Sequence, residues 1–253
     1  MPATALRPRS ATEIIDASFQ LLRRHYTQLV AVAVVALLPY IVLVAVTGGA
    51  TTDAATGVSG VRIILVFLAQ WLCAALAEAA VIVGVSDAYL EGRVDITRSL
   101  ASTVSRLPTI IGAGFVRGLA VLVGFIAFIF PAFYVMLRTF AIIPVVVLEE
   151  KSAGDSLSRS WELAKGEVGK IFLTLLLAWM IFFVLYFLLL MIVGMLASQN
   201  ERAVSLVVGL LMALVYPITG VVTTLLYYDI RVRREGFDLE LLAREAAPVA
   251  PSA

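Results

Sequence analysis

Three ionisable residues stand deep inside long apolar runs of this sequence, namely Glu78, Arg117 and Arg138. At about 1.5 Å of rise per helical residue, each lies roughly 12 to 17 Å from one end of its run. A lone charge at the centre of a bilayer costs roughly 2.5 to 3.5 kcal/mol, so each of these side chains should face protein or water. Gln70 lies about two helical turns before Glu78 in the same run. We therefore predict an intramembrane polar cluster formed by these four residues.

Two interpretations of this cluster remain open. In the first, Glu78 forms an ion pair with one of the arginines and fixes the register of the helices. In the second, the cluster binds an anionic headgroup or forms a path for a proton or ion. The two arginines exceed the single carboxylate by one positive charge, and an uncompensated buried charge attracts an anion.

Residue types that carry enzymatic chemistry are scarce. His25 is the only histidine and Cys73 the only cysteine, and they are far apart in the sequence, so neither a zinc site nor a Cys–His nucleophile pair is available. No glycine-rich phosphate loop or nucleophile elbow occurs. We expect no enzymatic activity, no cofactor and no metal. The net charge of +1 gives no reason to expect a nucleic-acid partner.

The elements that position these residues are predicted to be transmembrane helices. Hydrophobic residues make up 61% of the 253 residues and charged residues 15%, and the mean hydropathy is +1.00. A bilayer core of about 30 Å needs about 20 apolar helical residues. We predict an all-α membrane bundle with six spans, at Gln28–Thr47, Ile63–Ala88, Thr109–Phe130, Pro131–Leu148, Gly169–Ala197 and Ala203–Ile230.

The third and fourth predicted spans meet at Phe130 and Pro131 with almost no loop. A single helix of that length would exceed the bilayer, whereas proline is tolerated in the first turn of a new helix. We predict a tight hairpin, with a re-entrant kink as the alternative.

Orientation follows from the lysines and arginines in the short connections. Fifteen of the 19 basic residues fall on one side of the predicted membrane, and only Arg62 and Arg202 fall on the other. By the positive-inside rule, both termini should be cytoplasmic. We expect one membrane domain over residues 1–240 and a disordered tail over residues 241–253.

The sequence also contains an internal repeat. Shifted by 142 positions, "SATEIIDASFQLLRRHYTQLV" from Ser10 aligns without a gap on "SAGDSLSRSWELAKGEVGKIF" from Ser152, and the same shift carries Asp87 onto Asp229. Each start resembles a helix-capping box. A weaker third copy begins at Asp95. We predict three units of one amphipathic helix and two spans, at about residues 10–93, 95–150 and 152–235.

The three amphipathic helices each carry an apolar stripe opposite their basic residues. The stripe residues include Phe19 and Tyr26, Leu100 and Val104, and Trp161, spaced as on one helical face. Such helices are typical of the cytoplasmic membrane interface, where anionic lipid headgroups would attract their basic side. The alternative is that the stripes pack on neighbouring spans as a collar.

Three stretches carry a family likeness: "LRPRSATEIIDASFQLLRRHY", "VVVLEEKSAGDSLSRSWELAKGEVGKIF" and "LLYYDIRVRREGFDLELLAR". They resemble the membrane domain family of glycerophosphoryl diester phosphodiesterase, over about residues 6–244. The resemblance implies a multi-pass protein of the bacterial cytoplasmic membrane. In fused members, hydrolase activity is expected from a separate soluble barrel with acidic metal ligands and histidines, and this chain has a single histidine. The resemblance therefore supplies no catalytic residues.

Taken together, these features predict a non-enzymatic scaffold or partner subunit that contacts membrane lipid, another membrane protein or a further copy of itself. The alternative is a transporter or channel for a small anion or amphiphile, using Glu78, Arg117 and Arg138. A cavity that reaches these residues would favour transport, and a closed, dry cluster would favour the scaffold.

Overall fold

The computed structural model describes residues 7–47, 60–196 and 201–239, and within these ranges it is all-helical. The predicted tail, the residues between the first two spans at 48–59 and those at 197–200 lie outside this part. The helices are α1 (Ala11–Thr47), α2 (Gly60–Leu90), α3 (Ile96–Ser105), α4 (Leu107–Ala127), α5 (Ile129–Arg138), α6 (Ile142–Leu148), α7 (Ala153–Leu163), α8 (Val168–Leu196) and α9 (Glu201–Glu235).

Among the described residues, six helical segments are long and apolar enough to cross a membrane, which confirms the six predicted spans. They are Ala11–Thr47, Gly60–Leu90, Leu107–Ala127, Ile129–Leu148, Val168–Met195 and Leu206–Glu235. The first begins well before the predicted span because the segment from Ala11, predicted as an amphipathic helix, continues directly into it. The helical geometry is interrupted at His25 (φ −121°, ψ 15°), close to the predicted start of the apolar part.

The third and fourth spans form a tight hairpin. The turn lies at Phe128, and Pro131 is the third residue of α5 rather than the first residue after the turn. The two arms approach closely at Gly124, where a Cβ atom would lie 2.8 Å from the Cα of Ala132. Glycine is therefore required here for the backbones to come together.

The fourth span is broken into α5 and α6, which the sequence reading did not predict. Thr139 and Ala141 flank the break. Ser160 of α7 forms hydrogen bonds with the backbone groups that the break leaves without a helical partner. Its hydroxyl donates to the carbonyl of Arg138 (2.9 Å) and accepts from the amide of Ala141 (3.1 Å). Irregular backbone at membrane depth is tolerated when protein groups pair it in this way.

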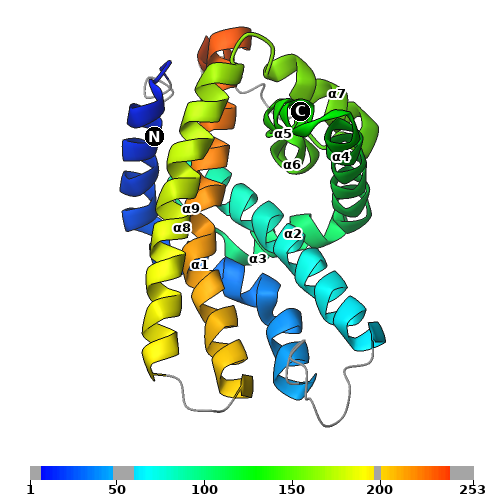
Figure 1. The fold of residues 1–253 in the computed structure, drawn as a ribbon. Helices are drawn as coiled ribbons and strands as arrows, with labels where there is room; N and C mark the ends of the chain where they lie inside the picture. Colours follow the sequence, from blue (N-terminus) through cyan, green and yellow to red (C-terminus); the bar gives the residue numbers. More distant parts are fainter. Residues whose placement is uncertain (1–6, 48–59, 197–200, 240–253) are drawn as a thin grey trace, which may run out of the picture.

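Helices α1, α2, α8 and α9 pack together, and α4 to α7 form a second group beside them (Figure 1). Helix α9 lies along α1 and crosses α2 closely, since a Cβ atom on Gly220 would lie 2.5 Å from Val81. One end of the molecule carries the starts of α1 and α8, the ends of α2 and α9, and helices α3 and α7. We call it the basic end.

The two short helices at the basic end begin at the predicted capping residues. The Asp95 carboxylate accepts from the amide of Arg98 (2.9 Å), and the Ser152 hydroxyl accepts from that of Asp155 (3.2 Å). Their buried residues are mainly small and polar: Ser99 and Thr103 on α3, and Ser156 and Ser160 with Leu163 on α7.

Candidate functional site

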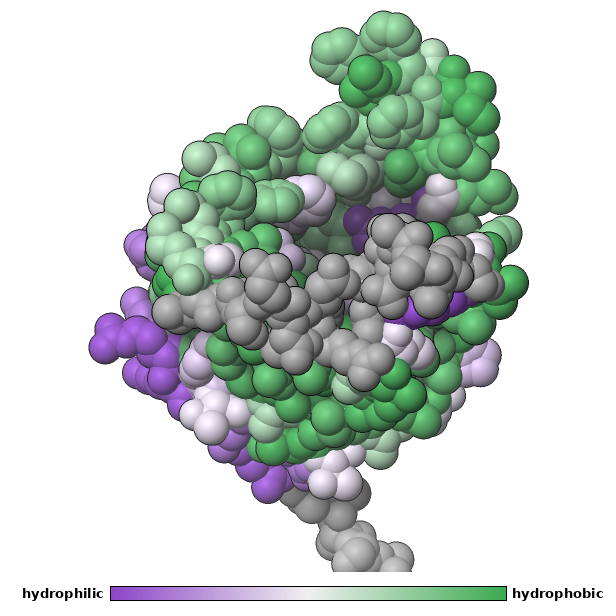
Figure 2. Space-filling model, turned by 60° about the horizontal axis from the view of Figure 1, so that its bottom comes forward, coloured by the Kyte–Doolittle hydropathy of each residue, from purple (hydrophilic) through white to green (hydrophobic). Residues whose placement is uncertain are grey.

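A cavity of about 470 Å³ opens between α2, α4, α5, α8 and α9, in the apolar part of the molecule. Its polar lining comes from Glu78, Arg117, Tyr216, Thr219 and Thr223. Figure 2 turns the lower end of Figure 1 toward the viewer and shows a hollow in the apolar surface with hydrophilic atoms in its depth. The volume lies within the range of about 300 to 1,000 Å³ that is usual for small-molecule sites.

Two members of the predicted cluster, Glu78 on α2 and Arg117 on α4, line this cavity. Both side chains are half-buried, and the two charges act on each other electrostatically. Within the described ranges, however, no salt bridge of 4.0 Å or less and no hydrogen bond joins the Glu78 carboxylate to another side chain. The two charged groups are thus available to a polar group that enters between the helices.

The remaining wall of the cavity is aromatic and aliphatic. Trp179, Phe182 and Phe183 of α8 form edge-to-face contacts with centroid distances of 5.7 to 5.9 Å. The Tyr216 hydroxyl donates to the carbonyl of Ala74 (2.9 Å), which fixes the phenol between α9 and α2. The cavity thus combines two side chains of opposite charge, which form no direct ion pair, with a wall of apolar rings. Such a lining is suited to a molecule with one polar and one apolar part.

Arg138 does not join Glu78 and Arg117. It is 8% exposed, and its guanidinium lies over the rings of Trp161 (4.7 Å) and Tyr134 (5.6 Å). Its Nε atom is buried without a hydrogen-bond partner among the described residues. The helix break directly after Arg138 redirects the chain, so the arginine stacks on α7 rather than lining the cavity.

Gln70 also lies outside the cavity, because it is exposed on the surface of α2. Depth in the membrane alone placed it in the cluster, but eight helical residues separate it from Glu78 by about 12 Å along the axis.

The two acids related by the 142-residue shift are both buried and both bound by basic residues. Asp87 pairs with Arg98 (3.4 Å). Asp229 accepts from Arg233 (3.0 Å) and pairs with Lys170. They connect elements of the basic end.

The predicted stripe residues have different surroundings. Tyr26 donates to the carbonyl of Leu214 on α9 (3.0 Å), Leu100 packs on the main core, and Trp161 packs on Arg138. Phe19 is 39% exposed and Val104 is 59% exposed. The stripes therefore provide both contacts to neighbouring helices and exposed apolar surface.

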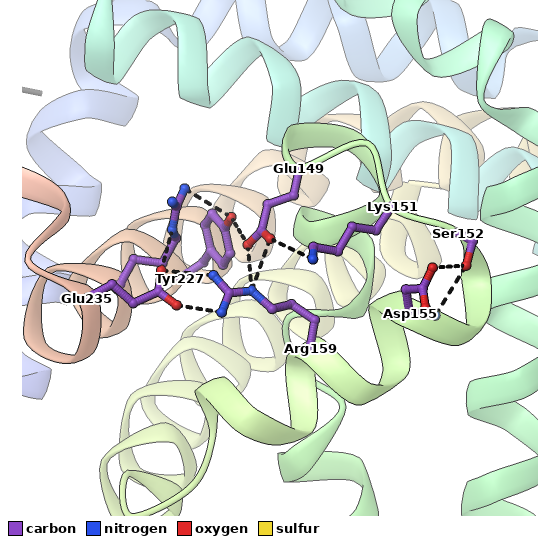
Figure 3. Close-up of polar contacts among 8 residues, drawn as sticks. Glu149, Lys151, Ser152, Asp155, Arg159, Tyr227 and Glu235 are labelled. Carbon is purple, nitrogen blue, oxygen red and sulfur yellow. Dashed lines mark hydrogen bonds and ion pairs between the residues drawn. The ribbon is translucent and has the colours of Figure 1, made fainter. Parts of the chain in front are cut away.

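Figure 3 shows a polar network at the basic end that the sequence reading did not single out. Arg159 of α7 contacts Glu149 through Nε (3.0 Å) and Glu235 of α9 through Nη2 (2.8 Å). Tyr227 donates to the Glu149 carboxylate (2.8 Å), and Arg231 pairs with Glu235 (3.1 Å). The only signal in the sequence was the conspicuous "LEEKS" after the fourth span.

The charge of Arg159 is stabilised by this network. Burial lowers the pKa of Arg159, but hydrogen bonds with Glu235 and Glu149 outweigh burial and raise the pKa above the ordinary arginine value. The network thus joins the connection after α6, helix α7 and the end of α9 through a permanently charged residue.

No group of three or more His, Cys, Asp or Glu side chains in the described residues could hold a metal ion. The cavity itself contains one carboxylate and no histidine or cysteine.

Residues 107–232 match the family described as the membrane domain of glycerophosphoryl diester phosphodiesterase. Over these residues, the chain belongs to that membrane-domain family. The match covers α4 to α8 and most of α9, so it includes Arg117 and Arg159, whereas Glu78 lies before it and Glu235 after it. No match was found among curated proteins or solved structures. The family and the six apolar helices identify a multi-pass integral membrane protein.

Proposed function

We propose that this membrane protein binds an amphiphilic molecule in the intramembrane cavity and does not convert it chemically. The observation that carries the proposal is the position of Glu78 and Arg117 on one cavity, without a direct ion pair and facing aromatic residues of α8. A polar group would lie between the two charges and an apolar chain against the rings. This role agrees with a subunit that contacts lipid.

Transport is the second candidate function. The cavity reaches two of the three intramembrane charges, which favours passage of an amphiphile over a closed structural cluster. Transport requires in addition that the cavity become accessible from both sides of the membrane.

Removal of either charge in the cavity should reduce retention of bound amphiphile. In Glu78→Gln or Arg117→Gln, we expect roughly tenfold less co-purifying lipid, because each variant loses charge-assisted hydrogen bonds. Thr219→Phe should have a similar effect by filling the cavity without altering a charge. The measurement is native mass spectrometry of protein extracted in mild detergent.

Gln70→Ala is the matched control, since Gln70 is an exposed polar residue of the same helix that does not line the cavity. It should retain lipid as the wild type does. Equal retention by all four variants would exclude the cavity as the binding site.

We also infer that the basic end faces the cytoplasm, because it carries most of the lysines and arginines. In a Cys73→Ala background, Gly60→Cys should react with a membrane-impermeant maleimide in intact cells. Ser158→Cys on α7 should react only after permeabilisation. Both positions are exposed. The opposite labelling pattern would reverse the orientation and the assignment of both termini to the cytoplasm.

The internal repeat is supported by two contacts between α2 and α9. Ser86 is hydrogen-bonded to Tyr228 (2.6 Å), and Ala74 to Tyr216 (2.9 Å). Both pairs are separated by 142 residues, which is the shift that aligns the first and third units. Two parallel helices related by an axis along the membrane normal would bring each residue against its own counterpart in this way. We infer that these two units are copies of one ancestor.

The exposed stripe residues support a further part of the proposal, which is that the helices of the basic end contact lipid at the interface. Phe19 and Val104 remain exposed apolar side chains near arginines, as in interfacial helices. The half-buried Trp161, which packs on Arg138, instead supports the collar interpretation for α7.

A further inference from the structure

A second cavity, separate from the intramembrane one, lies at the basic end between α1 and α2. Its volume is about 320 Å³. The polar and aromatic residues that line it are Arg9, Gln20, Arg24, His25 and Tyr89. No carboxylate of the described chain is among its lining residues. This composition differs from that of the intramembrane cavity, which pairs one acid with one base.

Arg9 is held in place through its main chain. Its amide donates to Asp229 (2.6 Å), and its carbonyl accepts from Lys170 (2.6 Å) and Arg233 (2.7 Å). Its guanidinium lies over the ring of Tyr89, 5.9 Å from the centroid. The first turn before α1 is thereby fixed against α8 and α9, and the Arg9 side chain is directed toward the end of α2.

Arg24 and His25 lie at the interruption of α1. The Nδ1 atom of His25 is hydrogen-bonded to Gln28 (3.0 Å), which orients the imidazole ring. For the Arg24 guanidinium, the described residues provide neither a hydrogen bond nor a carboxylate within 4.0 Å. Asp229, the acid that accepts from the Arg9 amide, is bound by Lys170 and Arg233.

The geometry points to a binding site for a phosphate ester in this second cavity. Guanidinium groups bind phosphate oxygens bidentately, and the cavity places two of them beside an imidazole and an amide. A volume of about 320 Å³ suits a headgroup rather than a whole lipid. Leu21 and Leu225 in the wall provide apolar contact for the carbon skeleton of the ester.

A phosphate ester could come from two sources, a lipid headgroup or a soluble metabolite, and three probes distinguish them. The probes are phosphatidylglycerol, diacylglycerol with the same chains, and glycerol 3-phosphate. Each is titrated into purified full-length protein in neutral detergent, and binding is measured by native mass spectrometry. An Arg117→Gln background weakens the contribution of the intramembrane cavity, and the comparison of Arg24→Gln with Arg23→Gln is made within this background, so the result does not depend on the function proposed above.

We expect phosphatidylglycerol to bind and diacylglycerol to bind at least tenfold more weakly. Arg24→Gln should weaken phosphatidylglycerol binding roughly tenfold. Arg23→Gln should leave it unchanged, because Arg23 is an exposed neighbour that does not line the cavity. Arg9→Gln, which keeps the main-chain contacts, should weaken binding as Arg24→Gln does.

If glycerol 3-phosphate binds and Arg24→Gln weakens its binding to the same extent, the site takes a soluble phosphate ester. This result would also support the proposed phosphate site. The proposal is overturned if neither phosphate probe binds, or if Arg24→Gln and Arg23→Gln bind phosphatidylglycerol with equal affinity.

Discussion

Replacing Arg159 by glutamine is expected to lower the free energy of unfolding by about 2 to 3 kcal/mol. The change leaves Glu149 with Lys151, at 3.9 Å, as its remaining cationic neighbour, and the Glu149 side chain is only 12% exposed. Removing one partner of a fully buried pair costs about 3 to 5 kcal/mol. The effect here should be smaller because the Arg159 side chain is 20% exposed and that of Glu235 is 29% exposed. The measurement is unfolding by a denaturing detergent in mixed micelles.

Arg93→Gln provides the comparison for this prediction. Arg93 is 78% exposed and pairs with Glu91 at 3.4 Å, so its loss should cost less than about 1 kcal/mol. The double variant Glu149→Gln, Arg159→Gln should be more stable than Arg159→Gln alone, since it removes a buried carboxylate whose closest cation has been lost. Equal stability of Arg159→Gln and Arg93→Gln would show that the network does not stabilise the fold.

Gly124→Ala is expected to destabilise the protein by about 2 kcal/mol, within the range of about 1 to 3 kcal/mol for overpacking. The added methyl group would lie 2.8 Å from the Cα and 2.9 Å from the amide nitrogen of Ala132, so the two arms of the hairpin must separate. Thermal unfolding in detergent, followed by tryptophan fluorescence, measures the effect. Separation of the arms should also alter the cavity, to which α4 and α5 both contribute.

Gly118→Ala is the matched control on the same helix. A Cβ atom there meets no other atom within 4 Å, and alanine favours a helix over glycine by roughly 0.5 to 1 kcal/mol. Gly118→Ala should therefore leave stability unchanged or raise it slightly. If Gly124→Ala behaves in the same way, the close contact between the arms is not a determinant of stability.

The apolar runs allowed all six spans to be predicted from the sequence, because lipid imposes the same length and helical backbone on each. The capping residues Asp95 and Ser152 were also identified correctly, since capping depends on residues only three positions apart. Each of these features depends on residues that are close together in the sequence, so the sequence alone is sufficient to predict it.

The features that could not be predicted depend on contacts between distant residues. The break after Arg138 requires the hydroxyl of Ser160, which periodicity does not reveal. Arg138 was assigned to the membrane cluster by depth alone, but stacking on Trp161 decides its position. Depth was sufficient for Glu78 and Arg117, because their helices happen to present them to the same cavity.

The packing of the first helix along the last has a consequence for biogenesis. Helix α1 leaves the ribosome first, yet its main partner, α9, is synthesised last. The contacts of Arg9 with Asp229 and of Tyr26 with Leu214 also join these two ends of the chain. The first span can pack on α2 early, but it must remain in the bilayer without α9 until translation of residues 201–235 is complete. During this interval, lipids or an insertion factor must cover the α1 surface, and a chain truncated before α9 should be a substrate for membrane proteases.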